Sequence, residues 1–219
     1  MSEKLWSDVD SYLEGILIGD DPVLEATRKA SLAAGLPDIA VSATQGKAAA
    51  SDGAHDRRET DSRGRHARRL QRDLDGARVA CRRRTHHAGI RSEACRCGAR
   101  QYQECGSCDR VTVITGAAID TLPTLTGPFD FSFIDADKKS NPDYFQWALK
   151  LSRRGSVIVV DNVVREGQVI EANSGDANVE GIRRLNTIMA GEQRVSATAI
   201  QTVGVKGHDG LAIALVVAA

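Results

Sequence analysis

The amino-acid sequence predicts an α/β fold, with a mostly parallel sheet, an antiparallel hairpin at its C-terminal end and helices on both faces. Two stretches, 129–139 and 155–162, each begin with an apolar run of strand length and end in acidic or amide side chains, which is typical of buried parallel strands. Two later apolar runs, 196–203 and 210–217, flank a glycine-containing turn and predict the hairpin. A chain of 219 residues can bury a substantial core, so we expect residues 1–219 to form one domain.

The first 38 residues predict two helices. Apolar residues recur at helical spacing over 7–18, after a serine or aspartate that can cap the helix. A second helix begins after Asp21 and Pro22, because proline is favoured at the first helical position. Gly35 and Pro37 then end this helix.

From residue 109 onward the sequence predicts alternating strands and helices. A strand is expected at 111–115, and helices are expected at 119–125, 142–151 and 179–189. Tyr144 and Trp147 lie in the second of these helices, and we expect them to pack in the core rather than contact a substrate. His208 is placed in the hairpin turn at 204–209, as a solvated loop residue.

The side chains that follow the two central strands are candidates for a metal site. Because ligands of open α/β sheets bind at the carboxyl ends of the strands, Asp135, Asp161 and Asn162 are expected to converge there. Two carboxylates and an amide carbonyl, with no soft ligand, suit a hard divalent cation such as magnesium. Lys138, three residues after Asp135, can reach the same position. The alternative is that these residues cap helices or lie in solvated turns.

These two motifs resemble those of a known enzyme family. Phe-Ile-Asp-Ala-Asp-Lys-Lys at 133–139 and Val-Ile-Val-Val-Asp-Asn-Val at 157–163 resemble the cation-dependent class I O-methyltransferases, which include catechol and caffeoyl-CoA O-methyltransferases. The resemblance covers roughly residues 1–47 and 109–219. It implies a Rossmann-like methyltransferase sheet, and transfer of a methyl group from S-adenosylmethionine to a hydroxyl of a catechol-like small molecule.

The resemblance also implies roles for individual residues. Asp135, Asp161 and Asn162 would bind a divalent cation, either magnesium or, as alternatives, calcium or manganese. Lys138 would lie beside the hydroxyl that is methylated and act as its base. Contacts with S-adenosylmethionine are implied for three residues, Val41, Ala118 and Asp135.

Expectations for assembly and location follow from the same reasoning. In the resembling family the N-terminal helices, here 1–38, cover the active site and contribute to a dimer interface, so we expect a homodimer. The sequence has no secretory signal and no apolar stretch long enough to span a membrane, so we expect a cytoplasmic protein without membrane contact.

Residues 48–108 depart from this pattern. The window holds 14 of the 22 arginines and all five cysteines of the chain, but no lysine and only eight acidic residues. Apolar periodicity is almost absent over 51–103, which is typical of a disordered or nucleic-acid-binding segment. The pairs Cys95/Cys97 and Cys105/Cys108 resemble fragments of a zinc site. Because a second CxxC pair is missing and Tyr102 is the only aromatic residue that could stack on bases, we disfavour both zinc and nucleic acid.

Our hypothesis is that residues 48–108 are translated in the wrong reading frame. Starting each codon one base later permits Glu-Val-Gly-Thr-Leu-Gly-Gly-Tyr-Ser over 63–71 and Ile-Thr-Leu-Glu-Phe over 86–90. These stretches would supply the glycine turn and the acid-ended strand that bind a nucleotide-like cofactor. Without them we expect weak cofactor binding, and unpaired flanks on the strands at 111–115 and 129–135.

Two other functions compete with methyl transfer. The first is an inactive or binding-only Rossmann-like remnant whose arginine-rich insert contacts nucleic acid, and salt-dependent retention on DNA would favour it. The second is a nicotinamide-dependent oxidoreductase, which is disfavoured because the written sequence lacks the glycine fingerprint of dinucleotide-binding folds.

Overall fold

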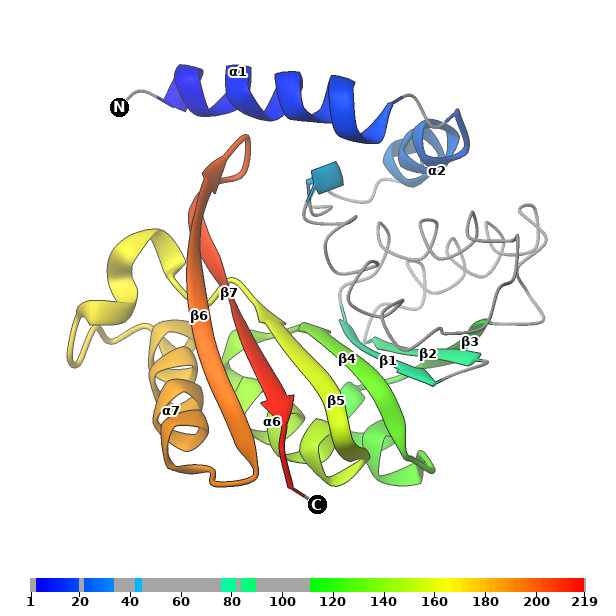
Figure 1. Ribbon diagram of the computed structural model, residues 1–219, viewed down its shortest axis with the longest axis vertical. Helices are drawn as coiled ribbons and strands as arrows, with labels where there is room; N and C mark the ends of the chain where they lie inside the picture. The colour runs from blue at the N-terminus through cyan, green and yellow to red at the C-terminus, as the bar shows by residue number, and fades with distance from the viewer. Residues whose placement is uncertain are drawn as a thin grey trace.

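Among the described residues, seven strands form one mixed sheet in the order β3-β2-β1-β4-β5-β7-β6 (Figure 1). The computed structural model describes residues 3–19, 22–33, 42–44, 76–81, 84–89 and 111–218. The strands are β1 Gly76–Cys81, β2 Arg84–Gly89, β3 Val111–Thr115, β4 Phe129–Asp135, β5 Ser152–Asp161, β6 Val195–Gly204 and β7 Gly207–Val216. All except β1 and β7 run in the same direction. The predicted α/β class is therefore confirmed, including the C-terminal antiparallel hairpin.

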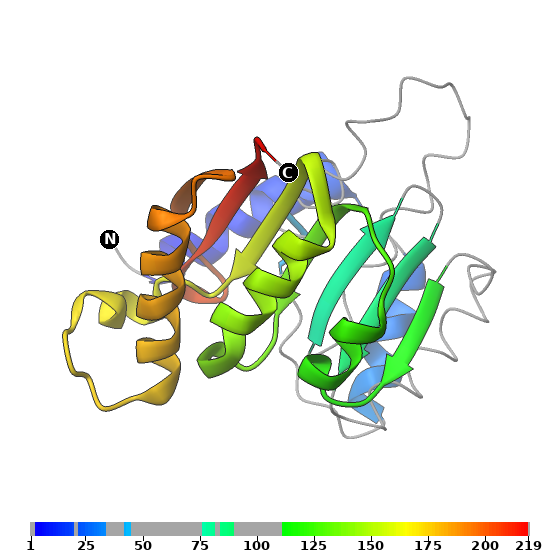
Figure 2. The ribbon, with the colours of Figure 1, turned by 90° about the horizontal axis from the view of Figure 1, so that it is seen from below.

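Helices lie on both sides of the sheet, and α6 and α7 are seen against the strands β4 to β6 in Figure 2. The α-helices are α1 Glu3–Leu13, α2 Pro22–Ala33, α5 Ala118–Thr121, α6 Asn141–Lys150 and α7 Ala177–Gly191. A π-helical segment, η1 Glu14–Ile18, extends α1, and the 3-10 segments are η3 Leu122–Thr124, η4 Lys138–Ser140 and η5 Arg165–Ile170. Within the described residues, no helix is long and apolar enough to cross a membrane.

The core lies between the sheet and helices α6 and α7. Phe145 of α6, Ile182 and Leu185 of α7 and Ile158 of β5 are all fully buried there. Helix α7 forms where apolar residues recur every three or four positions, and Asp176 caps it by accepting a hydrogen bond from the Asn178 amide at 2.7 Å. Burial of each large side chain stabilises the fold by roughly 1.5–3 kcal/mol.

Strands β1 and β2 overturn two expectations for the window 48–108. The sequence pattern predicted disorder there and unpaired flanks on β3 and β4, but β2 pairs in parallel with β3 and β1 pairs antiparallel with β4. A ladder needs only backbone amides and carbonyls, so the two strand edges that lack partners can recruit a segment with a weak side-chain pattern. Because β1 is antiparallel to β4, its first residue, Gly76, lies opposite Asp135.

The C-terminal hairpin is tighter than predicted. Gly204 pairs directly with Gly207, so the connection is Val205 and Lys206 rather than the whole segment 204–209. His208 therefore lies in strand β7, with its Nε2 atom 3.0 Å from the Gln201 side-chain oxygen, and its placement in a solvated turn was wrong.

Helix α1 crosses the tip of this hairpin (Figure 1). The Asp10 carboxylate accepts a hydrogen bond from the Val205 amide at 2.8 Å. An added Cβ at Gly204 would clash with Asp10, so glycine permits this close approach. The predicted N-terminal helices are confirmed, although α1 begins at Glu3, four residues before the expected start.

Candidate active site

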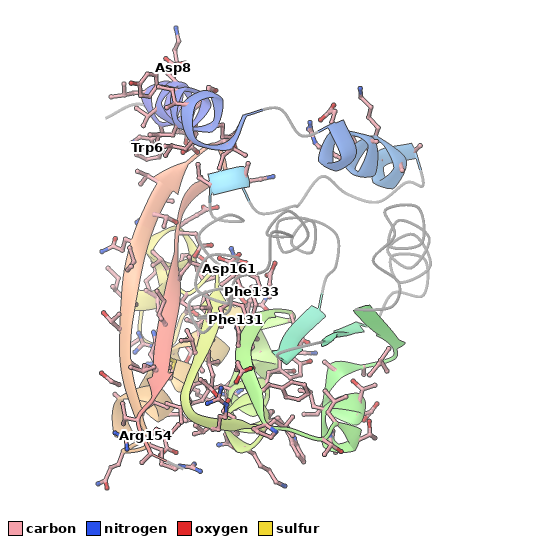
Figure 3. All side chains as sticks on the ribbon, turned by 45° about the vertical axis from the view of Figure 1, so that its right-hand side comes forward. Trp6, Asp8, Phe131, Phe133, Arg154 and Asp161 are labelled. Atoms are coloured by element: carbon pink, nitrogen blue, oxygen red, sulfur yellow. The ribbon has the colours of Figure 1, made fainter. Side chains whose placement is uncertain are left out.

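The carboxylates of Asp135 and Asp161 end two adjacent parallel strands. Ile134 of β4 pairs with Val160 of β5, so the next residue of each strand, Asp135 and Asp161, lies at the same edge of the sheet. In Figure 3, Asp161 and Arg154 mark the two ends of β5, with Asp161 at the end that faces the N-terminal helices. The chain crosses from β4 to β5 through α6, and the parallel pairing of the two strands places both carboxyl ends at the same edge.

Lys138 lies at this same edge, in the turn that follows β4. Its Nζ atom donates a hydrogen bond to the Asp135 Oδ1 atom at 2.7 Å, and only 9% of the lysine residue is exposed. The Asp137 carboxylate holds the rest of the turn, because it accepts hydrogen bonds from the Tyr144 hydroxyl at 2.6 Å and from the Ser140 hydroxyl at 2.5 Å. These hydrogen bonds therefore fix the backbone turn from which the Lys138 side chain extends.

The carboxylate of Asp161 is buried, with 4% of the residue exposed. Burial, followed by repulsion from the nearby Asp135 carboxylate, raises the pKa of Asp161 to about 7, while the Lys138 charge opposes this rise. The Asp161 Oδ1 atom accepts one hydrogen bond, from the Asn162 amide at 2.7 Å. The two carboxylates together thus carry more negative charge than Lys138 can neutralise, and a cation beside them would relieve the excess.

Asn162 follows Asp161 directly and has a left-handed backbone, with φ of 61°. Asparagine tolerates this conformation better than most residues. The amide side chain of Asn162 is half-buried at the same strand end as Asp161. All three oxygen-bearing residues predicted from the sequence therefore belong to one edge of the sheet, next to Lys138.

The residues predicted to contact a cofactor are only partly described. Val41 lies outside the described residues. Ala118 is buried at the start of α5, just after the strand end of β3. Because β2 and β1 lie between β3 and β4, the strand before Ala118 and the strand that ends in Asp135 are about 14 Å apart, at roughly 4.8 Å a strand. An acid at the carboxyl end of β2 is missing, since Ile90 and Arg91 follow Gly89 in the sequence.

Two further residues support the site, and sequence reasoning missed both. Gly181 of α7 lies so close to the turn that an added Cβ would clash with the Lys138 carbonyl. Asp209, at the start of β7, accepts hydrogen bonds from the backbone of the loop that follows Asn162. Neither residue has a sequence signal, because the contacting segments are more than 40 residues apart along the chain.

The site and fold can be compared with those of known proteins. An O-methyltransferase family model matches residues 84–216, which is more than half of the chain. A catechol O-methyltransferase of Mycobacterium tuberculosis is 47% identical over 217 residues, with 95% of each chain covered. A catechol O-methyltransferase of Niastella koreensis is 37% identical, with 99% of this chain and 100% of the relative covered. The chain belongs to the class I O-methyltransferase family.

Solved structures of other O-methyltransferases support this family assignment. An O-methyltransferase from Bacillus cereus in complex with SAH has a TM-score of 0.82 and 37% identity, covering 98% of this chain and 100% of the other. The O-methyltransferase TomG from Streptomyces achromogenes, solved with SAM, has a TM-score of 0.83 and 36% identity, with 99% of each chain covered. The family thus places this chain among enzymes that use S-adenosylmethionine as methyl donor.

Proposed function

We propose that this O-methyltransferase methylates one hydroxyl of a catechol-like small molecule, with a divalent cation held by Asp135, Asp161 and Asn162. The observation that carries the proposal is the register of β4 and β5, which sets two carboxylates side by side at a buried strand end. The names of the two curated relatives support a catechol as the acceptor. Two adjacent hydroxyls suit a cation that keeps open coordination positions.

The donor set fits a hard cation such as magnesium, with calcium or manganese as alternatives. Two carboxylates and an amide oxygen are oxygen ligands, and oxygen ligands favour these ions over softer metals. Among the described residues, no group of three or more His, Cys, Asp or Glu side chains could hold a metal. In this proposal the third protein ligand is the side-chain oxygen of Asn162. A bound cation would act as a Lewis acid that lowers the pKa of the acceptor hydroxyl.

Lys138 is the proposed base. Its Nζ atom lies at the strand edge beside Asp135, within reach of a hydroxyl placed between the two carboxylates. As the base, the Nζ atom would accept the proton of the acceptor hydroxyl. Asp135 also presents its negative charge to the positive sulfonium of the donor. Val41 and Ala118 are proposed to contact S-adenosylmethionine.

Removal of metal tests this function. With S-adenosylmethionine, catechol and Mg²⁺, we expect methylated product by mass spectrometry, and EDTA should lower the rate about 100-fold or more. Excess Mg²⁺ should restore the rate. Phenol, which offers a single hydroxyl, is the matched control and should be a poor acceptor. Equal rates with and without EDTA would contradict the cation's role.

We propose further that the protein is a homodimer that uses α1 and the tip of the β6–β7 hairpin. Apolar side chains that are exposed together on a surface mark interaction sites. Four side chains at helical spacing on α1 and η1, and three side chains of the β6–β7 hairpin, are each between 46% and 65% exposed: Leu5, Val9, Tyr12, Ile16, Ile200, Val203 and Val205. Sedimentation equilibrium should give twice the chain mass of 23.5 kDa, and a monomer mass would contradict this assembly.

The reading-frame hypothesis for residues 48–108 remains a proposal. It is supported by the abrupt change in arginine, lysine and cysteine content at both ends of the window. It is also supported by the missing acid after β2, which a ribose-binding site needs. Peptide mapping of the protein purified from its natural source reports which residues occupy the window, and recovery of the arginine-rich peptides would refute the hypothesis.

A further inference from the structure

The Asp209 carboxylate gathers three backbone amides around one oxygen atom. Its Oδ1 atom accepts hydrogen bonds from the amides of Val164 at 3.0 Å, Arg165 at 3.1 Å and Gly210 at 3.0 Å. Two of these amides belong to the loop after Asn162, more than 40 residues before Asp209 in the chain. Hydrogen bonds to a charged acceptor are stronger than neutral ones, so this carboxylate is an anchor for the loop.

The anchored loop has an unusual backbone. Asn162, Arg165 and Glu166 have φ values of 61°, 54° and 55°, in the left-handed region that residues with a side chain rarely adopt. Such a conformation persists only where surrounding contacts hold it. The far end of the loop is held as well, because Arg183 of α7 donates a hydrogen bond to the Val169 carbonyl at 2.6 Å.

Gly210 allows β7 to approach this loop closely. The Val163 amide donates a hydrogen bond to the Gly210 carbonyl at 3.1 Å. An added Cβ at Gly210 would lie 2.5 Å from the Ile200 carbonyl oxygen and 2.7 Å from a methyl carbon of Val164. The Asp209-Gly210 pair therefore holds the backbone of residues 163–165, which immediately follow Asn162.

We propose that Asp209 is a positioning residue that keeps the Asn162 side chain at the strand end beside Asp161 and Asp135. Asp209 acts through the backbone of residues 164 and 165. Its carboxylate also repels the carboxylate of Asp161 weakly, and Asp209→Asn separates this effect of charge from positioning. The consequence for cation affinity rests on the proposed function, because it requires Asn162 to be a ligand. Groups that orient metal ligands typically change metal affinity 10- to 100-fold when removed.

The test compares three variants for Mn²⁺ binding, measured by electron paramagnetic resonance, and for amide hydrogen exchange over residues 162–170. Asp209→Ala should raise the Mn²⁺ dissociation constant about tenfold or more and accelerate amide exchange in the loop. Asp209→Asn keeps an acceptor oxygen, so both effects should be smaller. Asp176→Ala, which removes the carboxylate that caps α7, is the matched control and should change the Mn²⁺ dissociation constant less than twofold.

The outcomes distinguish the positioning role of Asp209 from the proposed metal site itself. If the wild-type protein binds Mn²⁺ and Asp209→Ala binds it equally well, Asp209 has no positioning role, while the proposed function stands. If Asp209→Asn weakens binding as much as Asp209→Ala but leaves loop exchange unchanged, the effect is one of charge and the positioning role is wrong. If the wild-type protein itself fails to bind Mn²⁺, the proposed metal site is wrong, and the role of Asp209 at that site is wrong with it.

Discussion

Replacement of Asp161 with alanine is expected to reduce cation-dependent methylation of a catechol by a factor on the order of 10³ or more. The change removes one of two carboxylates at the strand end, and loss of a Lewis acid corresponds to several kcal/mol of transition-state stabilisation. The rate of methyl transfer at saturating Mg²⁺ is the measurement. Asp130→Ala is the matched control, because Asp130 pairs with Arg153 at the opposite end of the same sheet and should leave the rate nearly unchanged.

The same substitution should stabilise the metal-free protein at alkaline pH. The pKa of Asp161 is raised from 3.8 to about 7, so the folded state binds this proton more tightly than the unfolded state does. The free energy of unfolding therefore falls as pH rises from about 4 to about 7, by up to roughly 4 kcal/mol, and this contribution is lost above pH 7. Urea unfolding with EDTA at pH 5.5 and pH 8 should show this fall in the wild-type protein and a smaller fall in Asp161→Ala.

An Asp161→Ala variant that retains the wild-type rate would contradict the assignment of Asp161 as a cation ligand. A variant that loses activity and also unfolds more easily at pH 8 would indicate a structural role instead. Activity and stability are thus expected to change in opposite directions, which general damage to the fold does not produce.

Replacement of Lys138 with methionine is expected to lower kcat by about 10² to 10⁴, with little change in the affinity for Mg²⁺. A positioned general base contributes a factor of this size. Lys138→Arg should also lose activity, because arginine keeps the positive charge beside Asp135 but does not release its proton in proteins. The measurement is kcat at saturating S-adenosylmethionine and Mg²⁺, which should be low in both variants.

Lys139→Met is the matched control for Lys138, since Lys139 is the next residue and its side chain is exposed. It should leave kcat within about twofold of the wild-type value. If Lys138→Arg were as active as the wild-type protein, Lys138 would act through its charge alone and would not be the base.

The central strands and their polar endings follow from the sequence because their signals are local. An apolar run that ends in Asp135 or Asp161 predicts both a buried strand and the position of the carboxylate. Strand β3 was predicted at its observed bounds, Val111–Thr115. Parallel pairing then places strand ends together whatever the intervening residues are, so the sequence alone predicts Asp135 and Asp161 at one edge.

The roles of β1, β2 and the hairpin turn were not predictable in the same way. The segments Gly76–Cys81 and Arg84–Gly89 have little apolar alternation, and they form strands because β3 and β4 offer edges to pair with. The predicted hairpin turn is longer than the observed one because the strands continue through Gly204 and His208, which carry no strong strand signal. In both cases the decisive interaction is with a backbone that is distant in the sequence.

The sequence by itself determined the fold class, the oxygen-rich strand ends and the position of Lys138, because each depends on neighbours within a few residues. Only the tertiary structure decided that Asp161 is buried beside Asp135, that Gly181 lies in close contact with the Lys138 turn and that Asp209 holds the loop after Asn162. These features arise where segments distant in the chain pack together, β5 with β7 and α7 with the turn that carries Lys138. Burial and long-range hydrogen bonds depend on which segments pack together, and one segment's residues do not encode that alone.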